Sequence, residues 1–271
     1  GMSAYTNDLT GAIALISVQG PRSRDFLQTQ LKEADLEALK FFWFTQGLIE
    51  ETELLVSRTG YTGELGYELY IPAEEAAAMW EHLEKTGKEF GLLPYGVAAM
   101  QSLRIEKAFP LYGPDIDESR NPFEAGLNRW IKFEKRKFIG REALLQIQDM
   151  GISERWTGLT LVSEMPAKTG DRIFSISDIA TYREKMFTGS EAGESFDIES
   201  VGEYVGEVTS SANGYSVEKT LALGYIQVTH SWPGARLLVE VNDRPTLAEV
   251  VTTPFIDPSG VRLRAIGPRK V

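Results

Sequence analysis

The chain has 271 residues, of which 42% are hydrophobic, and it carries a formal net charge of -11. This length predicts two globular domains, and the acidic balance argues against a nucleic-acid surface, because no basic stripe is present to neutralise phosphates. The absence of cysteine excludes disulfides, thiolate metal sites and cysteine nucleophiles, and it fits a cytoplasmic compartment. We find no signal peptide and no apolar run long enough to span a bilayer, so we predict no membrane association.

The first half of the chain predicts an α+β domain. Residues 12–18 (AIALISV) form a short apolar run before Gly20 and Pro21, which predicts a buried strand that leads into a helix. Further strands are expected at 41–49, 51–59 and 67–71, and further helices at 73–92, 95–109 and 138–150. This order is a split βαβ pattern, so we predict a ferredoxin-like sandwich with its helices on one face.

The second half predicts a small all-β barrel domain. Short β-like segments separated by turn residues occur at 156–162, 203–211, 219–230, 235–241 and 246–253. Asn242 and Asp243 are expected to close a hairpin, and the acidic, glycine- and serine-rich stretch 182–200 is expected to be an inserted surface loop. Gly151 ends the last helix of the first half, so we place the domains at 1–150 and 151–271.

The stretch from Gly60 to Pro72, GYTGELGYELYIP, joins two predicted strands through a glycine-rich turn. Glu68 and Tyr70 share one face of the second strand, because side chains alternate between faces. The glycines leave the backbone open to a flat ligand, and a carboxylate accepts two parallel hydrogen bonds from the N–H and NH2 edge of a pterin or guanine ring. The residues alone leave two roles open for Glu68: binding such an edge in a cavity, or a solvent-facing glutamate on a half-exposed sheet, which chemistry alone favours.

Other patterns argue against metal and dinucleotide sites. The run DIDESRNPFEAG from Asp115 begins like a calcium loop, but its sixth residue is Arg120 rather than glycine and its twelfth is Gly126 rather than glutamate. His82 and His230 are too far apart in sequence to indicate a metal cage. The glycine-rich turn leads into a strand, whereas a dinucleotide fingerprint needs a helix N-terminus. We predict no metal.

Two stretches resemble the folate-binding core of the aminomethyltransferase family, which comprises the T-protein of the glycine cleavage system and its relatives. They are GYTGELGYELY and, further on, YGVAAMQSLRIEKAFPLYGPDIDESRNPFEAGL. Among the relatives, SLRIEK and FIGREAL are most similar to the folate-binding parts of dimethylglycine and sarcosine dehydrogenases. The resemblance runs from about residue 11 to about residue 265. It implies tetrahydrofolate as cofactor and one-carbon transfer as activity.

The resemblance also implies the pocket residues. Tyr61 and Glu68 are expected to line the folate pocket, with Tyr61 stacked on or capping the ring; the alternative for Tyr61 is a half-buried tyrosine at a strand end. T-proteins commonly have an arginine where this chain has Met100, so core packing is the favoured role of Met100 and pocket lining the alternative. The missing arginine casts doubt on T-protein activity in the strict sense.

Five further residues follow from the second stretch and the residues just after it. Tyr112 and Glu124 match the family, and their loop is expected to close over the pocket. Trp130 lies one place beyond the position of a T-protein pocket tryptophan, where this chain has Arg129, and we expect Trp130 to form a pocket wall. Within SLRIEK, Arg104 and Glu106 are expected to form an ion pair that fixes the helix.

No catalytic residue is assigned. Family members carry, upstream of the region that resembles this chain, a segment with the aspartate thought to act on transfer at folate N5. No residue here matches that aspartate, and Asp8 has no motif around it. The expectation is that another polypeptide, or a part of the gene upstream of this sequence, supplies the acid.

Three functions remain open. The first is a folate-dependent transferase that takes a one-carbon unit from an amine-linked donor, which in T-protein relatives is carried on the lipoyl arm of a carrier protein. The second is a non-catalytic folate-binding or partner subunit that needs another chain to complete its active site. The third is a severed folate domain of a flavin-dependent amine dehydrogenase, which differs from the first in its donor.

Overall fold

The computed structural model describes residues 3–177, 199 and 202–264. The chain divides into two compact units, one formed by Gly1–Met100 with Ser259–Val271 and the other by Gln101–Pro258. The boundary expected near residue 150 falls inside the second unit, so a division there stays a prediction. None of the helices in the described ranges has the length and hydrophobicity needed to cross a membrane.

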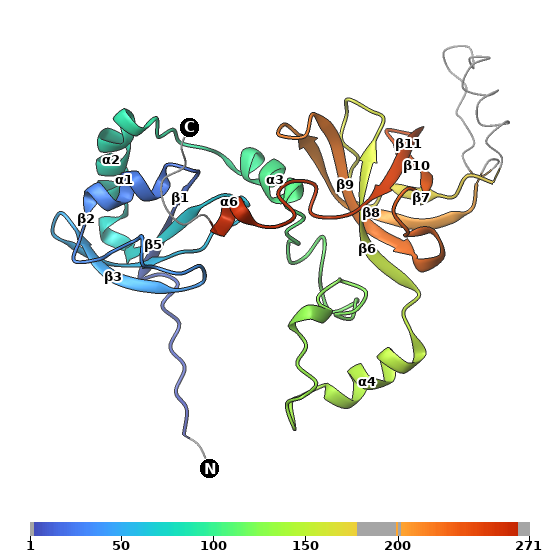
Figure 1. Cartoon of the computed structure of the whole chain (residues 1–271), viewed down its shortest axis with the longest axis horizontal. Helices are drawn as coiled ribbons and strands as arrows, with labels where there is room; N and C mark the ends of the chain where they lie inside the picture. Colours follow the sequence, from blue (N-terminus) through green and yellow to red (C-terminus); the bar gives the residue numbers. More distant parts are fainter. Residues whose placement is uncertain (1–2, 178–198, 200–201, 265–271) are drawn as a thin grey trace. The chain divides into compact units, whose positions relative to one another are not determined.

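The first unit contains an antiparallel sheet of five strands in the order β1-β5-β4-β3-β2 (Figure 1). Its strands are β1 (Ile13–Gln19), β2 (Leu31–Lys32), β3 (Phe44–Ile49), β4 (Thr52–Ser57) and β5 (Gly66–Pro72). Its helices are α1 (Ser23–Gln30), α2 (Ala76–Thr86) and α6 (Val261–Arg264), with 3-10 turns η1 (Ala73–Glu75) and η2 (Gly87–Phe90). The strand predicted from residue 41 begins at Phe44, because Phe42 has a positive φ of 66° and lies in a turn.

One face of this sheet carries the core of the first unit. Tyr67, Leu69 and Ile71 of β5 are almost completely buried, and they belong to one hydrophobic cluster with Phe26 of α1 and Met79 of α2. Both helices therefore cover the same face, as the sequence pattern predicts. The opposite face holds the side chains of alternate residues, and several large apolar ones on it are exposed: Leu15 is 53% exposed and Phe44 is 65% exposed.

The second unit is built around a closed antiparallel barrel with the strand order β10-β11-β6-β9-β8-β7. The strands are β6 (Glu154–Leu161), β7 (Arg172–Phe174), β8 (Tyr204–Gly214), β9 (Lys219–Gln227), β10 (Arg236–Val241) and β11 (Arg244–Val251). The remaining elements are α3 (Val97–Glu106), which begins in the first unit, η3 (Asn128–Trp130), α4 (Arg141–Met150) and η5 (Val228–His230). The predicted fold class, an α+β sheet domain followed by a small barrel, is confirmed. The loop expected at 182–200 lies, except for residue 199, outside the described residues.

A buried ion pair ties α3 to the loop that follows it. Arg104 Nη1 lies 2.5 Å from Asp115 Oδ2, and the two side chains are 2% and 0% exposed. The expected ion pair between Arg104 and Glu106 is wrong, because Glu106 instead accepts a hydrogen bond from the backbone N–H of Ser216 at 2.7 Å. Arg104 does have the expected structural role, with a partner eleven residues away that helical spacing could not identify. Asp115 is also the first carboxylate of the calcium-like run, and it is occupied by its ion pair with Arg104.

Candidate functional site

The glycines of the turn before β5 make room for a side chain of the protein. A Cβ atom built on Gly60 or Gly66 would lie 2.0 Å or 1.9 Å from Oε1 of Gln19, far closer than any non-bonded contact. The sequence predicts that these glycines leave the backbone open to a flat ligand. This prediction is wrong at Gly60 and Gly66, because the side chain of Gln19 fills the space where their Cβ atoms would lie. Gly63 has a separate reason to be glycine, because its φ of 75° is left-handed.

Gln19 of β1 holds the two ends of this turn together. Its Nε2 donates to the backbone carbonyl oxygens of Thr59 at 3.2 Å and Tyr67 at 3.3 Å. Its Oε1 accepts a hydrogen bond from the hydroxyl of Thr62 at 3.1 Å. Because Thr59 precedes Gly60 and Tyr67 precedes Glu68, this one amide fixes the backbone on both sides of the turn.

Glu68 lies on the face of β5 opposite the core, as the alternation of side chains predicts, and it is half-buried. The hydroxyl of Thr59 donates a hydrogen bond to Oε2 of its carboxylate. The hydroxyl of Tyr70 lies 3.4 Å from the same oxygen. Among the described residues, no hydrogen bond reaches Oε1, so one oxygen of a partly desolvated carboxylate is available to a ligand.

Hydroxyl groups flank Glu68 on the two neighbouring strands. Ser17 of β1 and Ser57 of β4 are the residues directly opposite Glu68 in the antiparallel register, so all three side chains share one face. The Ser57 and Thr59 hydroxyl oxygens are 2.9 Å apart. The result is a row of small polar side chains across three strands, with the carboxylate in the middle.

Glu68 acts on the phenol of Tyr70, two residues further along the same face of β5. Burial raises the pKa of the Tyr70 phenol, and the adjacent negative charge of Glu68 together with its hydrogen bond raises the pKa further. Tyr70 therefore stays protonated at physiological pH and remains a hydroxyl donor toward Glu68.

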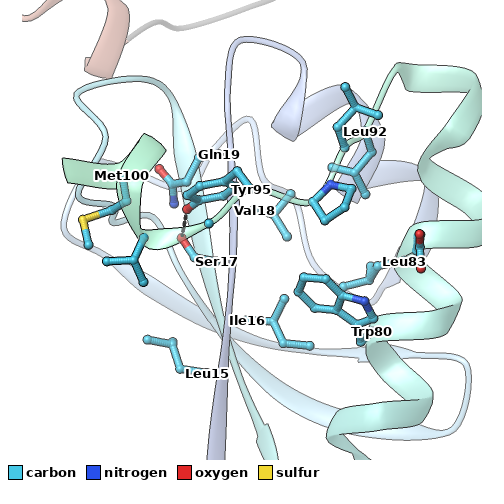
Figure 2. A pocket seen from close by; sticks show the side chains of 15 residues that line it. Leu15, Ile16, Ser17, Val18, Gln19, Trp80, Leu83, Leu92, Tyr95 and Met100 are labelled. Atoms are coloured by element: carbon cyan, nitrogen blue, oxygen red, sulfur yellow. Dashed lines mark hydrogen bonds between the residues drawn. The ribbon is translucent and has the colours of Figure 1, made fainter. Parts of the chain in front are cut away.

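A cavity of about 330 Å³ lies in the first unit beside β1, an edge strand of the sheet. Figure 2 shows Met100 near Gln19 at one end, Trp80 and Leu83 at the other, and Tyr95 across the strand. The Tyr95 hydroxyl donates to Oγ of Ser17 at 3.2 Å. The lining is predominantly apolar, and its volume is at the lower end of the range for small-molecule pockets. Glu68 does not line this cavity, but its neighbour Ser17 does.

Three of the predicted pocket residues, Tyr61, Glu68 and Met100, belong to the first unit. Tyr61 is half-buried in the turn, as both of its proposed roles allow. Met100 is half-buried and lines the cavity beside β1, so the structure favours pocket lining over burial in the main core.

Tyr112 and Trp130 belong to the second unit and are 71% and 61% exposed. Trp130 carries the guanidinium of Arg129 over its ring at 5.0 Å, and Glu124 accepts a hydrogen bond from the backbone N–H of Asn121 at 3.1 Å. That the five predicted side chains line one folate pocket stays a prediction.

The residues around Glu68 fit the pteridine ring of tetrahydrofolate. A carboxylate with one free oxygen and a fixed orientation matches the ring edge that carries adjacent N–H and NH2 donors. The neighbouring Ser17 hydroxyl can either donate or accept, as the alternating polar atoms of a pteridine require.

Gln19, Thr59 and Ser17 are site residues that the sequence analysis did not identify. Each acts on a partner about 10 to 50 residues away in the chain, so no local spacing reveals it. The one available signal was the pair of glycines at Gly60 and Gly66, which indicate a close approach without saying what approaches.

Both halves of the chain match known protein families. Residues 3–135 match the GCVT N-terminal domain family, and residues 186–257 match the glycine cleavage T-protein C-terminal barrel domain family. An aminomethyltransferase of Halothermothrix orenii is 36% identical over 243 residues, which make up 90% of this chain and 61% of that protein. One from Streptomyces avermitilis is 35% identical over 257 residues, or 94% of this chain and 63% of that protein. The chain thus spans about three fifths of the length of these relatives.

The fold is similar to that of a solved structure. The crystal structure of glycine cleavage system aminomethyltransferase T from Bartonella henselae superposes with a TM-score of 0.72 at 26% sequence identity. The superposition covers 90% of this chain and 60% of that chain.

Proposed function

Because the chain belongs to the glycine cleavage T-protein family, we propose that it serves tetrahydrofolate-dependent aminomethyl transfer and binds the pteridine ring at Glu68. The observation that carries this proposal is the half-buried Glu68 carboxylate, with Oε2 held by the Thr59 hydroxyl and Oε1 open. Tetrahydrofolate, when bound, supplies the nitrogen that accepts the one-carbon unit. The carboxylate binds the N–H and NH2 edge and so orients the ring, which is a role in positioning rather than in proton transfer.

The donor and the partners belong to the same proposal. An aminomethyl group on the lipoyl arm of a carrier protein is the donor that this family membership favours. The acid at the reacting nitrogen would come from a segment related to the two fifths of the relatives that lie outside the match. A cytoplasmic location stays a prediction.

Isothermal titration with tetrahydrofolate tests the binding site. We expect the unmodified chain to bind and Glu68→Ala to bind about 30- to 150-fold more weakly, which corresponds to the roughly 2–3 kcal/mol of a lost charge-assisted contact. Glu53→Ala is the matched control, because Glu53 is an exposed glutamate on the same face of the sheet and should leave affinity unchanged.

Two results would contradict the assignment of Glu68: equal affinity in the Glu68→Ala and unmodified chains, and an equal loss in the Glu53→Ala control. Tighter binding of guanosine, which presents the same N–H and NH2 edge, than of tetrahydrofolate would contradict tetrahydrofolate as the ligand.

The second candidate is a non-catalytic folate-binding or partner subunit. It is favoured by Met100, which stands where T-proteins commonly have an arginine. Turnover assays with tetrahydrofolate and an aminomethylated lipoyl carrier separate the two functions. Folate binding without turnover, even after addition of the unmatched part of a relative, supports the second.

A further inference from the structure

We propose that Thr59 is a positioning residue, whose hydroxyl sets the orientation of the Glu68 carboxylate and directs Oε1 toward the ligand. The proposed function supplies the identity of that ligand. The orientation of the carboxylate is a property of the chain alone, so it can be tested without any ligand.

The hydrogen bonds around Thr59 fix the direction in which it donates. An ionised carboxylate only accepts hydrogen bonds, so the single hydroxyl hydrogen of Thr59 must point to Oε2 of Glu68. The Ser57 hydroxyl, 2.9 Å from that of Thr59, must then donate to Thr59. Ser57, Thr59 and Glu68 therefore form a chain of hydrogen bonds with one direction, and it ends on Oε2.

Thr59 holds the carboxylate more firmly than Tyr70 does. The Tyr70 hydroxyl is 3.4 Å from Oε2, well beyond the 2.5–3.0 Å typical of O–H···O hydrogen bonds. A ligand that donates to both oxygens of Glu68 can displace this long contact at little cost. Thr59 is the partner that stays, because its hydroxyl lies within ordinary hydrogen-bond reach of Oε2 and its backbone is held by Gln19.

The backbone of Thr59 is itself immobilised from a third strand. Gln19 donates to the Thr59 carbonyl oxygen at 3.2 Å and fills the space that Gly60 and Gly66 leave empty. The position of the hydroxyl is thus fixed by β1, which places the donor before any ligand arrives. A carboxylate that is already oriented loses less conformational freedom when the ligand binds. Its affinity for the ligand is therefore higher than that of a freely rotating carboxylate.

Two substitutions at one position separate the hydroxyl from the shape of the side chain. Thr59→Val keeps the branched shape and removes the hydroxyl, and we expect about tenfold weaker binding of tetrahydrofolate in isothermal titration. Thr59→Ser keeps the hydroxyl, and we expect affinity within about twofold of the unmodified chain. Ser57→Ala removes only the outer donor, and we expect a loss of about threefold. Unmodified affinity in Thr59→Val, or no rescue in Thr59→Ser, overturns the proposal.

Crystal structures of the ligand-free chains supply the second measurement. We expect one orientation of the Glu68 carboxylate in the unmodified chain and in Thr59→Ser, and a rotated or multiple orientation in Thr59→Val. An unchanged orientation in Thr59→Val overturns the positioning role whether or not folate binds. Absence of folate binding by the unmodified chain, with the orientation lost in Thr59→Val, overturns the proposed function and supports the role of Thr59.

Discussion

The hydroxyls of Thr59 and Tyr70 both contact Oε2 of Glu68, and Glu68 acts on the pKa of Tyr70. The pKa of Tyr70 is raised first by burial and then by Glu68. A raised pKa means that the folded state favours the protonated phenol. The stabilisation that results is fully present below the unfolded pKa and disappears as pH rises through the folded pKa.

At this scale we predict that Glu68→Gln lowers the pKa of Tyr70 toward its ordinary value, because the negative charge that opposes ionisation is gone. The shift caused by burial remains. Nuclear magnetic resonance of tyrosine labelled at Cζ measures the titration of this phenol directly. Glu53→Gln is the control and should leave Tyr70 unaffected. If Tyr70 titrates alike in the Glu68→Gln and unmodified chains, Glu68 does not act on it as a charge.

Among the elements, the hairpin of β10 and β11 shows how closely local sequence can determine a turn. Asn242 and Asp243 have positive φ values of 49° and 60°, which are the angles of a two-residue hairpin turn whose twist matches that of the flanking strands. Asparagine and aspartate tolerate this conformation better than other side chains do. The predicted hairpin is confirmed with the predicted loop residues.

We predict that Asp243→Val destabilises the barrel by about 1–2 kcal/mol, because a β-branched residue is strained at positive φ. Asp243→Gly should be neutral or stabilising by up to about 1 kcal/mol, and Asp243→Asn is the matched control that tolerates the same angles. Thermal unfolding followed by circular dichroism measures the changes. Equal stability of the valine and asparagine variants would show that the turn is not strained.

At the scale of the whole molecule, the chain returns at its end to the unit in which it began. The segment from Ser259 onward belongs to the first unit, after the barrel has been completed. Leu263 of α6 is 8% exposed, and Arg262 Nη1 lies 2.9 Å from Oε1 of Glu64 in the glycine-rich turn. The last described helix thus contacts the turn that leads into β5.

We predict that removal of the residues from Ser259 onward destabilises the first unit by about 2 kcal/mol, mainly through the lost burial of Leu263. The barrel should be unaffected. Hydrogen exchange of the β5 and β9 amides separates the two units. Arg262→Ala alone should cost less than about 1 kcal/mol, because its ion pair is partly exposed. If removal of the segment accelerates exchange of the β9 amides more than exchange of the β5 amides, the assignment of the segment to the first unit is contradicted.

The sequence by itself determined the features that depend on local pattern. The alternation in YELYI assigned Glu68 to the face opposite Tyr67, and Gly151, with φ of 81°, ended α4 where expected. Barrel strands and their hairpin turn also followed from spacing and turn residues. These features were accessible because side-chain period and permitted φ angles act within a few residues.

Only the tertiary structure decided what the special residues contact. Gly60 and Gly66 could have admitted a ligand, yet they admit Gln19 from a strand about 40 residues away. Arg104 could have paired with its helix neighbour Glu106, yet it pairs with Asp115 in the following loop. A glycine indicates that space is needed beside the backbone, and a charged group indicates that a partner is needed. Which group meets that requirement depends on how distant segments pack, and no local pattern encodes it.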